Sequence, residues 1–270
     1  MNKTSLMKNK KGLVMGVANE RSIAWAIAKE LFNAGAEIAL TYQGDALKKR
    51  VYPLAKQINS PIILECNVEK ENDVTKTFKE IKNKWKNIDF VLHAIAFSNK
   101  EELKGKYIDT SKENFKKTLN VSCFSFTSVA KEASKIMTKG GSLLTLTYFG
   151  SEKVMPHYNV MGIAKAALET SVKYLAKDLG LKNITVNGLS PGPIKTLASS
   201  AIGDFNYILK WNEQNSPLKR NITAKEIANS ALYLLSDLAT GVTGEIHHVD
   251  SGYNIIGMKN ADSPDIFENQ

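Results

Sequence analysis

Residues 12–24 have the sequence GLVMGVANERSIA, which predicts a buried strand, a tight turn and the start of a helix. The run from Gly12 to Val17 shows no polar alternation, as is typical of a strand covered on both faces. In dinucleotide-binding folds, glycines in such a turn let the backbone approach a pyrophosphate at the helix N-terminus. Gly16 is the one glycine of that pattern present, and Ser22 stands where a hydroxyl can cap the helix and bond a phosphate oxygen. The stretch therefore predicts a nucleotide-binding unit, with a plain strand–turn–helix as the alternative.

Six further β-rich runs alternate with longer amphipathic segments. The helical period is clearest over residues 23–33 and 164–179. This alternation predicts a Rossmann-like, doubly wound α/β domain over residues 12–256, with one parallel sheet, helices on both faces and right-handed crossovers. The expected strands, seven in all, are 12–17, 36–41, 61–65, 89–94, 142–147, 184–189 and 245–249.

Three segments fall outside this pattern. Residues 195–217 have weak periodicity, with small residues followed by aromatic ones, and predict a mobile substrate-binding lid. Residues 257–270 are polar and predict a flexible tail. Residues 1–11 predict a flexible basic arm, because they contain no acid and four basic residues, Lys3, Lys8, Lys10 and Lys11.

The charge balance raises the question of a polyanionic partner. The 270 residues include 36 Lys and Arg against 27 Asp and Glu, a formal net charge of +9. Four of these positive charges lie in the arm, which leaves +5 on the remainder. A nucleic-acid binder would carry aromatic side chains interleaved with basic ones on one element, and we find no such element. Nucleic acid is therefore not an expected partner, although a non-enzymatic nucleotide-binding protein stays an alternative.

Cysteine usage and apolar runs bear on location. Cys66 and Cys123 are the only cysteines, with no CxxC pair and no His cluster, so neither a disulfide framework nor a metal site is expected. No run of about 18 apolar residues occurs, and the basic start lacks the apolar run of a secretory signal. We expect a cytoplasmic protein with no membrane partner.

Candidate cofactor residues follow the strands, because ligands bind at the carboxyl ends of the strands in an open parallel sheet. Gln43 follows the second strand, where an acid bonds the ribose hydroxyls and a basic residue accommodates a 2′-phosphate. A neutral residue there does not decide between NADH and NADPH; we favour NADH. The nearby basic residues are better explained as a solvated helix face than as a phosphate clamp; they are Lys48, Lys49 and Arg50.

The third and fourth strands end in further candidates. Asn67 and Val68 follow the third strand, where an amide side chain could hold the adenine amino group. Ile95 lies among small residues after the fourth strand, which would let backbone lie against a ribose. Packing at the strand ends is the alternative at each position.

Tyr158 and Lys165 are candidate catalytic residues. At 3.6 residues per turn they differ by about 700°, close to two full turns, so both would lie on one face of a helix that Tyr158 opens. An amphipathic helix surface would also explain an isolated pair of this kind.

The chain resembles the short-chain dehydrogenase/reductase superfamily over nearly its whole length. The resemblance rests on Tyr158 and the Lys165-Ala166-Ala167 helix, on residues 187–196 (NGLSPGPIKT) and on residues 249–252 (VDSG). Within the superfamily, the step from Gly16 to Ser22, the presence of Tyr148 and the seven-residue step from Tyr158 to Lys165 resemble the bacterial NADH-dependent enoyl-[acyl-carrier-protein] reductases. The resemblance implies reduction of the trans-2 double bond of an enoyl thioester in fatty-acid biosynthesis, with an acyl carrier protein as partner and a homotetramer as the assembly.

The spacing of the pair favours this activity over its main alternative, a carbonyl (3-ketoacyl) reductase. Most short-chain reductases place the tyrosine four residues before the lysine, where this chain has Met161. In an enoyl thioester the oxygen that becomes negative lies two bonds farther from the carbon that accepts hydride than in a ketone, a difference of roughly 2 to 3 Å. Moving the tyrosine back by three residues shifts it by about 4.5 Å along a helix, which matches that need in direction and size.

The resemblance also implies roles for single residues. Tyr158 would donate a hydrogen bond or proton to the enolate oxygen. Lys165 would hold the nicotinamide ribose and lower the pKa of Tyr158. Ile194 would pair its backbone with the carboxamide, and Thr196 its hydroxyl with the pyrophosphate. Tyr148 would either shape the pocket or contact the thioester.

Candidate substrate residues complete the prediction. Met155 and Met161 would line the acyl chain, with core packing as the alternative. The candidate substrate-binding residues are Ser98, Tyr158, Met161, Ala198, Ile202 and Phe205. Docking of a carrier protein would have to use Lys195, Lys210, Lys219 or Arg220. One departure from the family is Asn67, which stands where an acid is usual.

Overall fold

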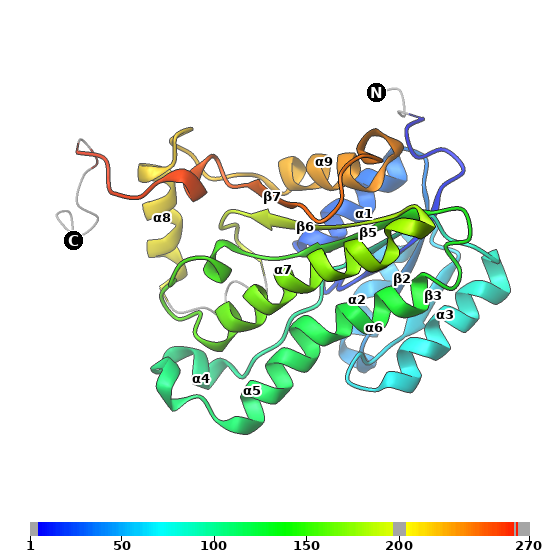
Figure 1. Ribbon diagram of the computed structural model, residues 1–270, viewed down its shortest axis with the longest axis horizontal. Coiled ribbons are helices and arrows are strands. Elements are labelled where there is room, and N and C mark those ends of the chain that lie inside the picture. Colours follow the sequence, from blue (N-terminus) through cyan, green and yellow to red (C-terminus); the bar gives the residue numbers. More distant parts are fainter. Residues whose placement is uncertain (1–4, 197–203, 262, 264–270) are drawn as a thin grey trace.

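A single parallel sheet organises the protein, whose computed structural model describes residues 5–196, 204–261 and 263 (Figure 1). Its seven strands lie in the order β3-β2-β1-β4-β5-β6-β7. This confirms the predicted doubly wound α/β fold, and each strand lies within two residues of its expected range. The strands are β1 (Lys11–Met15), β2 (Glu37–Tyr42), β3 (Ile62–Glu65), β4 (Phe90–His93), β5 (Gly141–Leu146), β6 (Ile184–Pro191) and β7 (Ile246–Val249).

Helices follow the strands, and among the described residues no helix is long and apolar enough to cross a membrane. The predicted helix over residues 23–33 is confirmed at both ends as α1. The helices are α1 (Ile23–Asn33), α2 (Gly44–Gln57), α3 (Glu71–Trp85), α4 (Lys100–Lys104), α5 (Lys112–Leu119), α6 (Ser125–Ala133), α7 (Val160–Leu179), α8 (Phe205–Asn215) and α9 (Ala224–Leu235).

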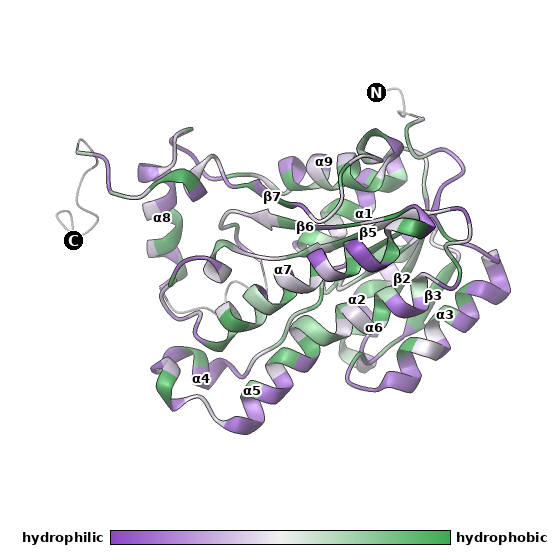
Figure 2. Ribbon diagram, in the orientation of Figure 1, coloured by the Kyte–Doolittle hydropathy of each residue, from purple (hydrophilic) through white to green (hydrophobic). Residues whose placement is uncertain are grey.

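The sheet is covered on both faces, which explains its unalternated apolar strands. On β1, Val14 enters a core formed with α1, α2 and α9, whereas Leu13 and Met15 enter a second core formed with α3, α6 and α7. All three side chains are fully buried. The covering helices carry both hydrophobic and hydrophilic residues, as helices with one buried side do (Figure 2).

The crossover from β6 to β7 departs from the predicted handedness. The chain moves across the sheet from β1 to β3 with α1 and α2 on one face, and from β4 to β6 in the opposite direction with α6 and α7 on the other face, so these crossovers share the right hand. From β6 to β7 the chain keeps the second direction, yet α9 packs beside α1 on the first face (Figure 1). This crossover is therefore left-handed. Residues 192–223 form a long connection that carries α8, and a long connection escapes the constraint that acts on short ones.

The prediction of a flexible arm over residues 1–11 is wrong for residues 5–11. Met7 is fully buried against α1, and its backbone N–H donates to the Ala34 carbonyl at 2.9 Å. Lys10 pairs with Asp237 at 2.8 Å, and Lys11 pairs with Glu37 at 3.1 Å. The buried Met7 side chain, the backbone hydrogen bond and the two ion pairs together anchor the segment, so these lysines lie on a fixed surface.

The predicted mobile lid over residues 195–217 contains a regular helix, α8, while residues 197–203 lie outside the described part of the chain. The periodicity is weak because Asn212 and Asn215 occupy buried positions of this helix, at 2% and 1% exposure. The Asn215 amide donates to the Trp211 carbonyl at 2.9 Å and accepts from the Asn260 backbone at 3.2 Å. A hydrophobicity pattern does not register such polar anchors.

The predicted flexible tail over residues 257–270 is also partly wrong. Besides Asn260, Ser263 packs on the end of α8, where its hydroxyl donates to the Gln214 carbonyl at 3.0 Å. Ser263 is 7% exposed. Hydrogen bonds to α8 thus hold Asn260 and Ser263, and a hydrophobicity pattern does not register such polar contacts.

Removal of the Met7 side chain tests the anchoring of the N-terminal segment. We expect Met7→Ala to lower the free energy of unfolding by about 2 to 5 kcal/mol, because a fully buried side chain leaves a cavity. Denaturant unfolding measures the change, with the neighbouring, exposed Lys8→Ala as the control, expected within about 0.5 kcal/mol of the parent. Equal stability of the two variants would contradict a packed segment.

Candidate active site

A glycine turn opens the site after β1. Gly16 has a φ of +100°, which side chains rarely adopt, and a Cβ there would lie 2.0 Å from the Ala94 carbonyl oxygen. The turn therefore packs directly on the segment that follows β4. Because β1 and β4 are neighbours from which the chain travels in opposite directions, this is the crevice where open α/β sheets bind ligands.

Ser22 stands at the start of α1, but it does not cap the helix. Its backbone has the extended conformation of an N-cap residue, yet its side chain makes no capping hydrogen bond. Its hydroxyl turns back to the loop, donating to the Asn19 carbonyl at 2.5 Å and accepting from the Ala18 N–H at 3.4 Å. The predicted cap is wrong, because loop groups compete for the same hydroxyl. The two hydrogen bonds of the hydroxyl hold the turn together, and its contact with a phosphate stays a prediction. Ile23 is the first residue of the helix and is half-buried.

The other candidate cofactor residues gather at the same edge of the sheet. Gln43 is exposed directly after β2. Asn67 follows β3, and its side-chain oxygen accepts from the Glu69 N–H at 3.0 Å, which leaves one lone pair for an adenine. Val68 is buried beside it, and Ile95 packs half-buried after β4. Their contacts with a cofactor stay predictions.

The end of β6 carries the last two cofactor candidates. Ile194 follows the strand and is half-buried against the core of α1 and α9. Thr196 is half-buried and is the last described residue before the gap. Both lie on the segment that leaves the carboxyl end of β6, so they occupy the edge that the predicted contacts require.

Lys165 reaches from α7 to the end of β5. Its ammonium donates to the Leu146 carbonyl at 2.6 Å, and the residue is 6% exposed. Burial lowers the pKa of Lys165 to about 8, against the opposing influence of Glu169 and Cys123. The structure thus holds a cation that titrates close to neutral pH at the carboxyl edge of the sheet.

Tyr158 lies in the turn before α7, not on the helix as predicted. α7 begins at Val160, so Tyr158 is not on the helix, and the argument from a shared helical face is wrong. Asn159 breaks the helix with a φ of 40°, and its amide donates to the Gly105 carbonyl at 2.8 Å. Further bonds to the carbonyls of Glu102 and Leu103 tie this turn to the end of α4.

The Tyr158 ring is held by a glycine and a second tyrosine. A Cβ on Gly150 would lie 2.4 Å from the Tyr158 ring, so only glycine leaves room for the ring. Tyr148 packs edge-on against Tyr158, with 5.1 Å between ring centres. Tyr158 is 7% exposed, and burial, with smaller contributions from Tyr148 and Glu169, raises its pKa above the ordinary tyrosine value. The expectation that Lys165 lowers this pKa is wrong, because desolvation dominates.

Met161 occupies the position four residues before Lys165. It is 8% exposed and belongs to a small apolar cluster with Tyr158, Leu103 and Val160. Its sulfur accepts a weak hydrogen bond from the Ser122 hydroxyl at 3.8 Å. A thioether has no proton to donate, so this position holds no acid.

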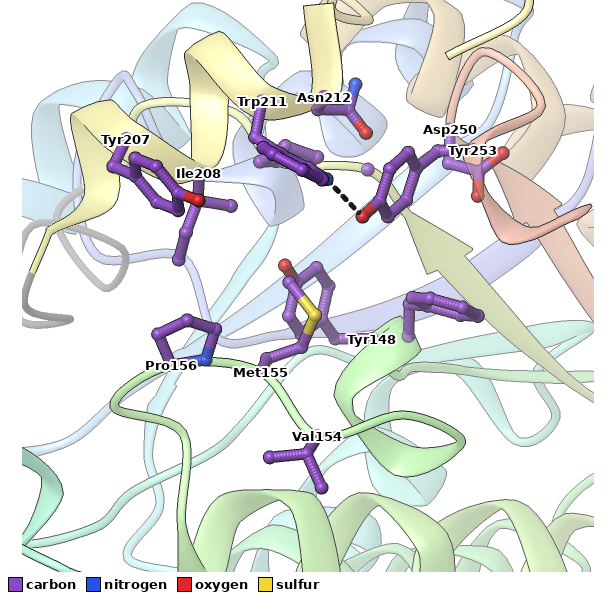
Figure 3. A pocket seen from close by; sticks show the side chains of 13 residues that line it. Tyr148, Val154, Met155, Pro156, Tyr207, Ile208, Trp211, Asn212, Asp250 and Tyr253 are labelled. Carbon is purple, nitrogen blue, oxygen red and sulfur yellow. Dashed lines mark hydrogen bonds between the residues drawn. The ribbon is translucent and has the colours of Figure 1, made fainter. Parts of the chain in front are cut away.

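An apolar cavity of about 210 Å³ opens beside Tyr148, whose hydroxyl points into it (Figure 3). Aromatic and aliphatic side chains from α8 and from the segment after β5 line most of it, among them Met155, Ile208 and Trp211. The Trp211 ring N–H donates to the Tyr253 hydroxyl at 2.8 Å and closes one side. A cavity of this character suits a hydrocarbon chain.

The candidate substrate residues are only partly brought together. Met155 lines the cavity, and Phe205 begins α8 outside the lining. The Ser98 hydroxyl accepts from Thr118 at 3.0 Å and from Asn114 at 3.2 Å, so it holds the loop after β4. Its substrate contact and those of Met161 and Phe205 stay predictions, and Ala198 and Ile202 lie outside the described residues.

Sequence reasoning missed the carboxylate that supports the site. Glu169 accepts hydrogen bonds from the Thr147 and Ser151 hydroxyls, each at 2.5 Å, and so pins both ends of the segment that carries Tyr148 and Gly150. The available signal was the four-residue step from Lys165, which places Glu169 on the same side of α7.

The arrangement corresponds to one class of dinucleotide-binding protein. A sheet in the order 3-2-1-4-5-6-7, with a tyrosine shortly before a buried lysine that reaches the end of the fifth strand, is that of the short-chain dehydrogenases/reductases. The family model described as Enoyl-(Acyl carrier protein) reductase matches residues 16–254. The chain belongs to this family of enoyl-[acyl-carrier-protein] reductases.

Individual relatives agree over almost the whole length. Enoyl-[acyl-carrier-protein] reductase [NADH] 1 of Rhizobium meliloti is 62% identical over 263 residues, which cover 97% of both chains. The crystal structure of the Anaplasma phagocytophilum reductase in complex with NAD matches with a TM-score of 0.94 and 53% identity, over 98% of this chain and 100% of that one. The Bacillus cereus reductase with NADP+ and indole naphthyridinone matches with a TM-score of 0.92 and 50% identity, over 94% and 99% of the two chains.

A methyl group on Gly150 tests how Tyr158 is held. We expect Gly150→Ala to cost about 1 to 3 kcal/mol of unfolding free energy, because the added carbon overlaps the Tyr158 ring. Gly180→Ala is the matched control, since it has no atom within 4 Å of the added carbon and a helical φ of −57°, and we expect it to be neutral or slightly stabilising. In a Tyr158→Ala background the cost of Gly150→Ala should shrink; an undiminished cost in this double-mutant cycle would contradict the contact.

Proposed function

We propose that the protein reduces the trans-2 double bond of an enoyl thioester carried by acyl carrier protein, with NADH as the hydride donor, as a step of fatty-acid biosynthesis. Membership of the enoyl-[acyl-carrier-protein] reductase family supports the reaction. The Rhizobium meliloti relative, whose name specifies NADH, and the Anaplasma phagocytophilum structure with NAD support the cofactor.

The observation that carries the proposal is the identity of the residues before Lys165. Carbonyl reduction needs an acid beside the carbon that receives hydride, but the corresponding position holds the buried thioether of Met161. The acid lies three residues earlier, as Tyr158, outside the helix and against Gly150. This displacement suits an enoyl thioester, in which the oxygen that gains charge lies two bonds farther from the reduced carbon than it does in a ketone.

The residues present fit a nicotinamide dinucleotide. The Gly16 turn leaves no room for a side chain and so allows close backbone approach, as a pyrophosphate requires. Ser22 would bind a phosphate oxygen, and the Lys165 ammonium, which has three donors, would hold the nicotinamide ribose while keeping its bond to the Leu146 carbonyl. The bound cofactor supplies the hydride for the β-carbon. Lys165 places its charge where the substrate oxygen becomes negative.

Tyr158 stabilises that oxygen by hydrogen bonding. An ordinary phenol is already protonated at neutral pH, and burial raises the pKa of Tyr158 further, so its hydroxyl remains a hydrogen-bond donor. Burial strengthens this interaction, since few waters compete with it. Tyr148 presents its hydroxyl to the apolar cavity and supports the Tyr158 ring from the side, so its proposed role is to shape the pocket around the thioester end.

The assembly and its partner are also proposals. A homotetramer is supported by exposed apolar side chains near one surface of α7; Ile163 is 42% exposed, Tyr174 70% and Phe124 56%. We propose a cytoplasmic location because its pathway partner, an acyl carrier protein, is expected there. Light scattering should give about four times the chain mass of 29.8 kDa; a monomer would contradict the assembly.

The acidic carrier protein would dock on basic residues near the site. Lys195 and Lys210 are exposed, whereas Arg220 is already bound to Glu226 through two hydrogen bonds, at 2.6 and 3.1 Å. Lys219 donates to the Gln214 carbonyl at 2.8 Å. Lys195 and Lys210 are therefore the proposed docking residues.

A comparison of two substrates tests the reaction. We expect NADH oxidation with crotonyl thioester and little with acetoacetyl thioester. Tyr158→Phe should reduce kcat by about 10²- to 10³-fold, because the donor to the developing oxyanion is lost while the ring that fills the site remains. Full turnover by this variant would exclude Tyr158 as the donor, and preferential turnover of the ketone would support a carbonyl reductase instead.

The lowered pKa of Lys165 predicts a pH dependence of cofactor binding. Lys165 is charged below its pKa of about 8 and loses its proton as the pH rises through that value. NADH affinity should therefore be constant in the acidic range and fall on the alkaline side. The titratable groups around Lys165 are Glu169 on the same helix, Cys123, and the neutral His93 on β4. Fluorescence titrations measure the affinity, and Lys165→Gln should bind weakly with no such dependence; an unchanged alkaline fall in this variant would assign it to another group.

A further inference from the structure

An acidic residue, Glu65, lies at the edge of the sheet where the proposed cofactor would place its adenosine ribose. β2 and β3 pair in parallel with Tyr42 opposite Glu65, so Glu65 lies beside the strand end that Gln43 follows. The Glu65 carboxylate accepts a hydrogen bond from the Gly44 N–H at 3.2 Å. Gly44 is the first residue of α2, so Glu65 occupies one of the free amides at the start of this helix.

The surroundings of Glu65 are acidic. Asp45 lies in the first turn of α2, one residue after the amide that Glu65 occupies. Both carboxylates act on the neighbouring Tyr42. Burial and Tyr52 raise the pKa of Tyr42, and Glu65 and Asp45 raise it further. Two negative charges thus converge on the end of β2.

Two basic side chains on the flanking helices have partners other than Glu65. The Lys48 ammonium lies over the Tyr52 ring, 5.9 Å from its centre. Lys84 on α3 donates to the Pro61 carbonyl, which precedes β3 at its opposite end. Neither of these two side chains forms a salt bridge with Glu65.

Nucleotide folds of this type ordinarily take the acid that bonds the ribose hydroxyls from the end of the second strand. That position holds Gln43, which is neutral and so cannot distinguish a hydroxyl from a phosphate by charge. We propose that Glu65, supplied by the neighbouring strand β3, selects NADH over NADPH: its carboxylate accepts from a ribose hydroxyl and occupies the α2 amide on which a 2′-phosphate would rest. This inference rests on the proposed NADH-dependent function.

Removal of one charge tests the inference. In Glu65→Gln the side chain keeps its size and an oxygen for the Gly44 amide but loses its charge. We expect the ratio of the dissociation constant of NADH to that of NADPH, measured by fluorescence titration without substrate, to rise at least about tenfold, because repulsion of the phosphate dianion is removed. The ratio of kcat/KM for NADPH to that for NADH, measured with crotonyl thioester, should rise with it. Glu65→Lys should raise the ratio further.

Glu37→Gln is the matched control, since Glu37 begins β2 and lies at the other end of the same strand, paired with Lys11. We expect its ratio to equal that of the parent protein. Thermal melting should show that every variant is folded. An unchanged ratio in folded Glu65→Gln, or an equal change in Glu37→Gln, would overturn the role of Glu65 and leave the proposed function intact. A parent protein that oxidises neither cofactor would overturn both.

Discussion

The hydrogen bond from the Lys165 ammonium to the Leu146 carbonyl, at 2.6 Å, is the interaction on which the site depends. A buried cation is costly unless it is bonded, and here it is bonded to the last residue of β5. The bond therefore fixes α7 against the carboxyl edge of the sheet. The charge of Lys165 also acts on His93 of β4. Burial, and then Lys165, lower the pKa of His93 to about 3. His93 therefore remains neutral and forms hydrogen bonds with Thr145 and Ser125.

Tyr158 lies outside α7 because the helix begins only at Val160. Asn159 leaves the helical conformation and is tied to the end of α4, so Tyr158 is carried by a turn and rests on Gly150. Glu169 fixes both ends of the segment that provides Gly150 and Tyr148. The acid is thus set back from the lysine by packing against neighbouring segments. The chemistry of an enoyl thioester requires this separation, whereas a ketone requires an acid closer to the carbon that is reduced.

The sequence was most informative where structure depends on local periodicity. The seven strands and the helix over residues 23–33 could be predicted because both cores need uninterrupted apolar residues at regular spacing. Prediction failed where a few specific contacts replace a pattern: buried Met7 and the ion pairs of Lys10 and Lys11 anchor a lysine-rich segment, and buried Asn212 and Asn215 hide the period of α8. The left-handed crossover to β7 was missed for a related reason, since it depends on a long connection rather than on the strands.

For the site, the residue types and their spacing could be predicted, but not how they are held. Tyr158 and Lys165 were found from their separation along the chain, although the helical geometry invoked for them was wrong. Glu65 went unnoticed because it acts on Gly44, which belongs to a different strand–helix unit. Contacts of this kind join residues far apart in sequence, and no single stretch carries a sign of them.

The transfer of a labelled hydride tests the central claim most directly. The protein is mixed with crotonyl thioester and NADH that carries deuterium at the transferred position of C4, and the product is examined by NMR. The arrangement of Tyr158, Met161 and Lys165 predicts a saturated butyryl thioester with deuterium on C3 and a solvent hydrogen on C2. A product with deuterium on C2, or a thioester that takes up no deuterium, would contradict it.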